Sequence, residues 1–326
     1  MILVTGSAGF IGSAIACMLN RSGHTDLLLC DVLRKNDKWN NIPGVRFREF
    51  IHRDALFSYL ESSPDAKKID TVIHMGACSD TTEPDVDYLN ANNVNFSKQL
   101  CRWALAQGAR FIYASSAAVY GSGELGFSDA DSLTPNLRPL NAYGFSKWLF
   151  DIWVLEQGLA DRVTGLRFFN VFGPNEYHKG HMASVVYRAF PLARDKGLVR
   201  LFESHRPDYK HGEQERDFIY IDEALDALRF ILKTPSVSGI YNIGTGIPHT
   251  FNDLATALLE GLGKPVNIEY FPMPEDIRNR YQYHTRADMD KLNNAGYPKI
   301  QDRFAQNVKD YVQKYLQPGF LYYSQV

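Results

Sequence analysis

Short apolar runs alternate with amphipathic stretches along roughly the first two-thirds of the chain. Several runs are continuously apolar, as expected for strands that are covered on both faces of a parallel sheet. Between them, apolar residues recur with helical spacing, as at Ile11, Ile15, Met18 and Leu19. The predicted strands are residues 2–5, 27–30, 45–50, 71–74, 111–115 and 163–168. This alternation predicts an α/β protein with a Rossmann-type, doubly wound parallel sheet.

The pattern changes after about Val171. Prolines and glycines become more frequent, and the polar stretch 203–215 predicts an exposed loop. Residues 216–221 predict a further strand, and the apolar residues of 225–232 predict a buried helix behind it. We therefore expect residues 1–170 to form a cofactor-binding Rossmann domain, with 217–245 packing back onto it. A smaller C-terminal α/β substrate domain would comprise residues 171–216 and 246–326.

The composition is that of an ordinary folded protein and disfavours some classes of partner. The 326 residues are 45% hydrophobic and 22% charged, and the formal net charge is −2, which does not suit a nucleic-acid groove or an anionic membrane surface. The sequence has no apolar run of bilayer-crossing length and no cationic leader. We expect a cytoplasmic protein that binds neither nucleic acid nor membrane. Its four cysteines occur outside any C-x-x-C pair and predict buried, reduced thiols: Cys17, Cys30, Cys78 and Cys101.

A glycine loop lies between the first predicted strand and the first predicted helix. Gly6, Gly9 and Gly12 have G-x-x-G-x-x-G spacing, and Phe10 and Ile11 lie in the same turn. The glycines permit a tight turn, and the start of the helix can hold a pyrophosphate with its N–H groups. Such a pattern alone is weak evidence. The strand before it and the helix after it favour a dinucleotide-binding site.

The residues after the second predicted strand bear on the choice between NAD and NADP. Asp31 stands where an acidic residue binds the adenosine ribose, which favours NAD. Arg34, Lys35, Lys38 and Arg53 follow, and such cations could meet a 2′-phosphate, although most surface lysines are simply solvated. On these residues alone, both cofactors stay open.

A candidate catalytic set follows the fifth predicted strand. Ser116 lies at the carboxyl edge of the sheet, where ligands bind in open α/β folds. Tyr143 and Lys147 are four residues apart and share one helix face. A nearby ammonium and a nicotinamide ring would lower the pKa of the phenol from its usual ~10. The Y-x-x-x-K spacing is common by chance, but with the glycine loop it predicts Tyr143 as acid/base, Ser116 on the reacting oxygen and Lys147 on the nicotinamide ribose.

These segments resemble the extended short-chain dehydrogenases, as do residues 216–222 and 241–244. Residues 170–184 read N-V-F-G-P-N-E-Y-H-K-G-H-M-A-S and are similar to N-V-Y-G-P-R-E-x-H-K-G-x-M-A-S of the ADP-glyceromanno-heptose 6-epimerase family. Residues 74–79, 81–83, 201–203 and 279–282 match further segments of that family. The resemblance runs from Met1 to about Tyr297.

The resemblance implies a reaction and two acid/base groups. The family epimerises C6 of ADP-D-glycero-D-manno-heptose to the L-glycero form, for the lipopolysaccharide core, by transient oxidation with tightly held NADP. The implied acid/base groups are Tyr143 and Lys179, one for each orientation of the oxidised intermediate. Without the resemblance, Lys179 would read as a solvated loop lysine. His178 and His181 beside it lack an acidic or thiol cluster, so we expect no metal.

The resemblance also implies the remaining site residues and a homo-oligomer. Besides the glycine loop, Asp31, Lys38, Arg53 and Lys147, the implied cofactor residues are Val32, Met75, Gly76, Ala77, Cys78, Ser79, Asn92, Val171 and Lys179. The implied substrate residues are Asn170, His181, Arg188, Phe202, Glu203, Ser204, His205, Arg216 and Tyr281.

Three departures from the family pattern stand out. Ser7 and His181 replace the usual glycine and serine, and residues 208–214 look like an insertion. The alternatives are another nucleotide-sugar epimerase or dehydratase that uses NAD, for which Lys179 would be expendable, and a regulatory protein that binds the nucleotide without turnover. The latter would be expected to lack the Ser–Tyr–Lys set.

Overall fold

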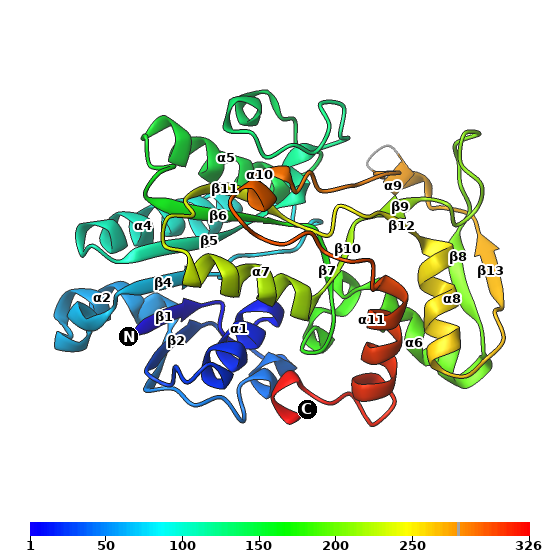
Figure 1. Cartoon of the computed structure of the whole chain (residues 1–326), viewed down its shortest axis with the longest axis horizontal. Helices are drawn as coiled ribbons and strands as arrows, with labels where there is room; N and C mark the ends of the chain where they lie inside the picture. The colour runs from blue at the N-terminus through cyan, green and yellow to red at the C-terminus, as the bar shows by residue number, and fades with distance from the viewer. Residues whose placement is uncertain (279–280) are drawn as a thin grey trace.

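The computed structural model describes residues 1–278 and 281–326 and is built on one parallel sheet (Figure 1). The strand order is β11-β6-β5-β4-β1-β2-β3, and every neighbouring pair is parallel. The strands are β1 (Ile2–Thr5), β2 (Leu27–Asp31), β3 (Glu49–His52), β4 (Thr71–His74), β5 (Arg110–Ser116), β6 (Val163–Phe168) and β11 (Gly239–Ile243). The predicted Rossmann-type sheet is confirmed.

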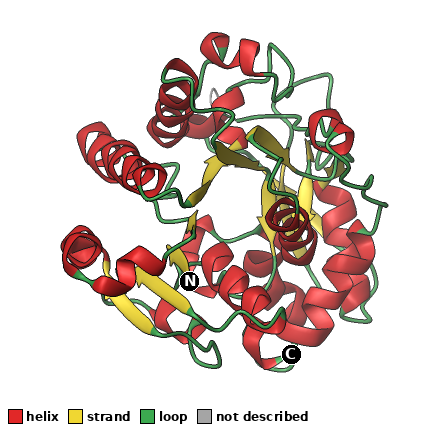
Figure 2. Ribbon diagram, turned by 60° about the vertical axis from the view of Figure 1, so that its left-hand side comes forward, coloured by secondary structure: helices red, strands yellow, loops and turns green. Residues whose placement is uncertain are grey.

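Helices cover both faces of this sheet (Figure 2). On β1, Leu3 and Val4 point to opposite faces because side chains alternate along a strand. Leu3 belongs to the apolar cluster shared with α2 (Leu56–Ser62), α4 (Phe96–Ala106) and α5 (Ala142–Glu156). Val4 belongs to the cluster shared with α1 (Phe10–Arg21) and α7 (Ile221–Lys233). Burial on both faces explains why central strands such as β1 and β2 are mostly apolar.

A second group of elements lies beyond one end of the sheet, on the right of Figure 1. Its strands form two-stranded sheets, β10 with β7, β12 with β9 and β13 with β8. They are β7 (Asn170–Phe172), β8 (Val199–Phe202), β9 (Glu215–Arg216), β10 (Phe218–Tyr220), β12 (His249–Thr250) and β13 (Ile268–Phe271). The larger helices here are α6 (Val185–Lys196), α8 (Phe251–Gly261) and α11 (Phe304–Tyr311). A shorter helix of this group is α9 (Glu275–Arg278), and shorter helices elsewhere are α3 (Val86–Leu89) and α10 (Asp290–Asn294).

Two predicted strands differ in extent from the observed ones. The strand predicted at 45–50 begins only at Glu49, because Gly44 has φ 90° and Val45 donates back to Ile42 in a turn. The strand predicted at 216–221 is broken at Asp217. The carboxylate of this residue is buried and accepts backbone hydrogen bonds from residues 245, 246 and 287.

The predicted division into domains stays a prediction. Residues 239–243 form β11 beside β6, and α7 lies against α1. Among the helices of the described ranges, none has both the length and the apolar character needed to cross a membrane.

Candidate active site

A cavity of about 770 Å³ runs along the carboxyl edge of the sheet. Its wall combines the ends of β1, β4, β5 and β6 with residues of α6 and the segment before it. The position agrees with the rule that ligands bind outside the carboxyl ends of parallel strands. It brings together all the predicted catalytic and cofactor residues and four of the predicted substrate residues.

Two glycines of the loop stand where a side chain would collide with backbone atoms. A Cβ on Gly12 would lie 2.1 Å from the carbonyl oxygen of Gly6, and one on Gly6 would lie 2.7 Å from the backbone nitrogen of Gly76. Gly6 also has φ 64°, a left-handed conformation that favours glycine. Position 7 does not require glycine, because Ser7 does not have a positive φ. The described non-glycine residues with positive φ are Arg34, Asn175 and Phe320. This bare loop at the start of α1 fits the pyrophosphate of a nicotinamide dinucleotide.

Asp31 is partly neutralised by a lysine. Its Oδ2 accepts from the backbone nitrogen of Ala8 at 2.8 Å, and its Oδ1 accepts from that of Val32 at 2.6 Å. Lys38 Nζ lies 2.7 Å from the same Oδ1. Arg53 also lines the cavity and donates to the side chain of Asn92. Two cations therefore stand at the end of the site where the adenosine ribose of a dinucleotide binds.

Ser116, Tyr143 and Lys147 meet between β5 and the start of α5. Helix α5 begins at Ala142, because Asn141 caps it by accepting from the backbone nitrogen of Gly144 at 2.8 Å. Ser116 bonds to the Tyr143 hydroxyl. Lys147 is 8% exposed, and its Nζ donates to the carbonyl of Ala114 at 2.8 Å.

The pKa of Tyr143 is raised within the chain alone, whereas the sequence predicted a lowered pKa in the presence of an ammonium and a nicotinamide ring. Burial raises the pKa of Tyr143, and the hydrogen bond from Ser116 only partly offsets this. Lys147 Nζ is engaged by the carbonyl of Ala114 and lies 6.0 Å from the centre of the tyrosine ring. Burial lowers the pKa of Lys147 to about 8. A lowered pKa of Tyr143 stays a prediction that depends on the bound nicotinamide.

Helix α5 is pinned to the sheet by a buried ion pair. Asp151 follows Lys147 by one helical turn and pairs with Arg167 of β6 at 2.9 Å, and neither side chain has any exposed surface. Tyr113 and Ser115 of β5 also donate to Asp151, at 3.0 and 2.9 Å. Asp151 thus joins the helix of Tyr143 to β6 through Arg167, and to β5, the strand of Ser116, through Tyr113 and Ser115.

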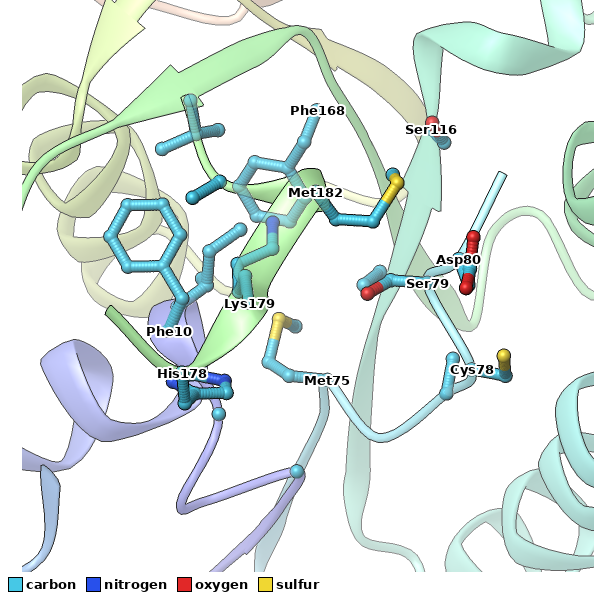
Figure 3. Close-up of a pocket in the computed structure, with 18 of the residues that line it drawn as sticks. Phe10, Met75, Cys78, Ser79, Asp80, Ser116, Phe168, His178, Lys179 and Met182 are labelled. Atoms are coloured by element: carbon cyan, nitrogen blue, oxygen red, sulfur yellow. The ribbon is translucent and has the colours of Figure 1, made fainter. Parts of the chain in front are cut away.

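Lys179 comes from a different element and reaches the same cavity. It lies in the short 3-10 segment η7 (Tyr177–Met182), which is broken at Gly180 with φ 55°. Figure 3 shows its side chain directed into the cavity near Phe10 and Phe168, with Ser116 on the far side. Its Nζ lies 5.6 Å from the centre of the Phe10 ring. Burial lowers its pKa, and the nearby carboxylate of Glu176 acts in the opposite direction.

The two histidines beside Lys179 differ in burial and in the groups that they contact. Burial lowers the pKa of His178 to about 4, so this ring is neutral at neutral pH. Its Nδ1 lies 3.4 Å from the side-chain nitrogen of Asn41. His181 is 66% exposed and lies 3.6 Å from Asp80. In the residues that the structure describes, no group of three or more histidine, cysteine or carboxylate side chains is arranged to hold a metal.

The predicted substrate residues separate into two groups. Asn170, His181, Arg188 and Arg216 line the cavity. The other five, Phe202, Glu203, Ser204, His205 and Tyr281, are absent from its wall and lie beyond Arg216. The guanidinium of Arg216 covers the Tyr281 ring at 5.0 Å, and that ring is 6.3 Å from Phe202. Asn279 and Arg280 of the family segment lie outside the described residues.

Residues 208–214, the predicted insertion, begin in the same outer region, where Tyr209 packs on Tyr283. Arg206 covers the rings of Tyr209 and Tyr283, at 5.3 and 5.0 Å. Tyr283 also bonds Ser204 and the backbone of His205.

Sequence reasoning missed several residues of the wall. Phe168 ends β6, so the rule that ligands bind at the carboxyl edge could have identified it. Asp80 and Met182 also line the cavity. No local pattern marks them, because they meet only through the folding of two distant loops. Cys78 is half-buried in this wall, whereas Cys17, Cys30 and Cys101 are buried as expected, and all four thiols are free.

A glycine loop at the first strand–helix turn, with serine, tyrosine and lysine around one cavity, defines an enzyme of the extended short-chain dehydrogenase/reductase class. Comparisons with known proteins narrow this class. The profile of the NAD dependent epimerase/dehydratase family matches residues 2–244. The ADP-L-glycero-D-manno-heptose-6-epimerase of Nitratidesulfovibrio vulgaris strain DP4 is 46% identical over 316 residues, which cover 97% of this chain and 98% of that protein.

Solved structures give the same picture. The crystal structure of the Helicobacter pylori ADP-L-glycero-D-manno-heptose-6-epimerase has a TM-score of 0.80 and 30% identity, covering 96% of this chain and 95% of that one. The Thermus thermophilus UDP-glucose 4-epimerase in complex with NAD has a TM-score of 0.73 and 26% identity, covering 95% and 97%. The chain belongs to the NAD dependent epimerase/dehydratase family and, within it, to the ADP-L-glycero-D-manno-heptose-6-epimerases. The predicted family is confirmed.

Proposed function

We propose that this enzyme interconverts the two C6 epimers of ADP-glycero-D-manno-heptose, a precursor of the lipopolysaccharide core, by transient oxidation at C6. The observation that carries the proposal is the meeting of Ser116, Tyr143, Lys147 and Lys179 in one cavity with a dinucleotide loop. Relatives that match this chain over nearly its full length share the name ADP-L-glycero-D-manno-heptose-6-epimerase, which favours this reaction over that of a hexose epimerase or a dehydratase.

Each part of the cofactor would be held by groups of this chain. The glycine loop receives the pyrophosphate, Asp31 the adenosine ribose, and Lys147 the nicotinamide ribose. Residues 75–79, together with Asn92 and Val171, complete the wall on either side. When bound, the nicotinamide supplies reversible acceptance of a hydride from C6.

Two acid/base groups are needed because the reacting oxygen occupies two positions. C6 carries a secondary alcohol, so oxidation leaves a ketone, and epimerisation requires that this ketone turn its other face. Its oxygen then points to a different side of the cavity. Tyr143, bonded to Ser116, exchanges the proton in one position, and Lys179 exchanges it in the other. Asn170, Arg188 and Arg216 bind the nucleotide sugar around them.

The direct test is the reaction itself. Purified protein is incubated with ADP-D-glycero-D-manno-heptose, and the configuration at C6 is read by NMR. Appearance of the L-glycero epimer supports the proposal. Turnover of UDP-glucose in its place, with the heptose untouched, would reject it.

We propose NADP as the cofactor in preference to NAD. The support is the ion pair of Lys38 with Asp31, which offsets part of the negative charge that would repel a 2′-phosphate, and the presence of Arg53 in the same wall. Denaturing the purified protein and separating the released nucleotide by chromatography tests this, and release of NAD alone would reject it. Changing Lys38 and Arg53 to alanine should lower the NADP preference by about 1.5–3 kcal/mol for each lost contact.

We further propose that the enzyme is a homo-oligomer. Val86 of α3 and Phe145 of α5 are 45% and 38% exposed, and Phe145 stacks on Trp148 at 5.8 Å. Neighbouring apolar side chains of this size favour contact with a second copy. Sedimentation equilibrium tests this, since a monomer at all concentrations would contradict it.

A cytoplasmic location is part of the same proposal. Free thiols persist in reducing compartments, and Cys17, Cys30 and Cys101 are free and buried. Cell fractionation followed by immunoblotting tests the location.

A further inference from the structure

The segment that carries Lys179 is closed by one buried carboxylate. Glu176 has no exposed surface. Its Oε1 accepts from the backbone nitrogen of Gly173 at 3.3 Å and from Ser184 Oγ at 2.7 Å, and its Oε2 accepts from the backbone nitrogen of Ser184 at 2.5 Å. Gly173 and Ser184 stand on either side of η7. The carboxylate therefore ties the two ends of this segment together.

The same carboxylate anchors the segment to a distant helix. The hydroxyl of Tyr311 in α11 donates to Glu176 Oε1 at 3.1 Å, and Tyr311 is fully buried. All these donors are neutral, and among the described residues no cationic nitrogen lies within 4.0 Å of the carboxylate. Burial raises the pKa of Glu176, and the hydrogen bonds from Ser184 and Gly173 and the nearby ammonium of Lys179, which favour the charged carboxylate, offset part of that rise.

We propose that Glu176 is the positioning residue of Lys179. Glu176 holds the segment 173–184 in the shape that directs the Lys179 ammonium into the cavity. Glu176 and Lys179 share one turn of the backbone, because the backbone nitrogen of Lys179 donates to the carbonyl of Glu176 at 2.9 Å. The role rests on the proposed function, in which Lys179 exchanges a proton with the C6 oxygen. Glu176 itself is absent from the cavity wall, so it acts only through Lys179.

The charge of Glu176 adds an electrostatic effect to this geometry. Burial lowers the pKa of Lys179, and the carboxylate counteracts that lowering, so it helps Lys179 to keep its proton. The groups that face Lys179 from other directions are the uncharged ring of Phe10 in α1 and His178, which burial keeps neutral. Glu176 is therefore the main source of negative charge at this amine.

The groups packed around Glu176 are neutral as well. Tyr177 in the same segment, Tyr187 of α6 and Tyr311 of α11 all face it. Burial and then the carboxylate raise the pKa of each phenol above its usual range, so none of the three ionises near neutral pH. Removing the charge of Glu176 should then move the titration of Lys179 to lower pH.

The test is Glu176→Gln, which keeps the size of the side chain but removes its charge and places an amide donor against the donors of Ser184. Each C6 epimer is mixed separately with the enzyme, and formation of reduced nicotinamide is followed by absorbance. We expect oxidation of one epimer to fall about 10- to 100-fold, as for a lost charge-assisted contact, and oxidation of the other to change less than about 2-fold. Tyr143, on its separate helix, should be undisturbed.

A second readout does not depend on activity. The pH dependence of acetylation of Lys179 by acetic anhydride, measured by peptide mass spectrometry, reports when the amine loses its proton. In Glu176→Gln the midpoint should lie at lower pH than in the wild type. This result stands even if Lys179 proves not to exchange a proton with substrate, so failure of the proposed function and failure of the positioning role are distinguishable.

The matched control is Glu223→Gln. Glu223 is likewise a capping carboxylate, which accepts from the backbone nitrogen of Tyr220 at 3.0 Å, but it lies on α7 outside the cavity wall. This variant should change neither readout. Equal slowing of both epimers in Glu176→Gln, or an acetylation midpoint identical to the wild type, would overturn the positioning role.

If Glu176→Gln does not fold, Tyr311→Phe takes its place. It removes one neutral donor to the carboxylate and keeps the charge. Oxidation of the same single epimer should fall about 3- to 10-fold, the value of one hydrogen bond, while the acetylation midpoint stays near that of the wild type. A loss that is equal for both epimers, or no loss, would contradict the proposal.

Discussion

The two groups that we assign to proton transfer are held in opposite ways. Tyr143 lies in the first turn of α5, a regular helix whose buried Asp151 pairs with Arg167 of β6 and accepts hydrogen bonds from β5. Lys179 lies in η7, which is broken at Gly180 and is held by neutral donors to one carboxylate, that of Glu176. The first group is part of the core of the sheet, whereas the second is attached to it by a small set of hydrogen bonds.

This difference separates stability from catalysis. Damage to the support of Tyr143 leaves a charge unpaired in the core, so it should appear first as lost stability. Damage to the support of Lys179 changes a short segment outside the central sheet, so it should appear mainly as the loss of one proton-transfer step. The predictions below test this contrast, beginning with the largest effect.

Tyr143→Phe should reduce epimerisation by about two to four orders of magnitude, the usual contribution of a general acid/base. The ring volume is kept and only the hydroxyl bonded to Ser116 is lost, so the melting temperature should change little. Turnover is measured by NMR at C6. The control is Tyr297→Phe, at a buried ring packed on Phe230 far along the chain, which should stay active. Near wild-type turnover in Tyr143→Phe would remove this residue from the mechanism.

Lys179→Met should be almost as damaging, with a loss of about two to three orders of magnitude, while the cofactor stays bound. One C6 epimer should still be oxidised in a single turnover and give reduced nicotinamide, because Tyr143 alone can accept the proton of its C6 hydroxyl. Rapid mixing with each epimer measures this. Lys196→Met, at an exposed position in the last turn of α6, is the matched control. If Lys179→Met forms both epimers at normal rates, the two-base assignment is wrong.

Asp151→Asn should destabilise the fold by about 3 kcal/mol, because it leaves the fully buried guanidinium of Arg167 without its anion. Urea unfolding followed by circular dichroism measures the free energy of unfolding. The same change at Asp226, which pairs with Arg229 on the surface, should have little effect. A stable Asp151→Asn protein that is defective only in turnover would show that the contrast between the two supports is mistaken.

The smallest effect concerns pH and the cofactor. The pKa of Lys147 is lowered to about 8, so its ammonium is present below that pH and is lost as pH rises through it. If the ammonium holds the nicotinamide ribose, affinity for the nucleotide should fall by up to about tenfold over the next pH unit. Fluorescence titration at about pH 7 and about pH 9 measures the change. Lys147→Met should abolish this pH dependence and Lys179→Met should keep it, whereas a pH-independent affinity of the wild type would reject the assignment.

Much of the sheet and the cofactor loop could be predicted because their signals are local. The mostly apolar runs 2–5 and 27–30 lie in β1 and β2, since strands buried on both faces favour apolar side chains. The spacing of Gly6, Gly9 and Gly12 encodes a turn that allows no Cβ, so it could be recognised from neighbouring residues alone. Tyr143 and Lys147 share a helix face for the same kind of reason.

Only the tertiary structure decided how the remaining groups act. Lys179 reaches Phe10, Asp151 meets Arg167, and Tyr311 reaches Glu176 across 135 positions of sequence. It also decided that Lys147 donates to Ala114 and that burial raises the pKa of Tyr143 within the chain. Burial and hydrogen bonding depend on which distant segments pack together, and such contacts leave no periodic trace in the sequence. The residue types and their local spacing were therefore set by the chain, whereas their charges and partners were set by its folding.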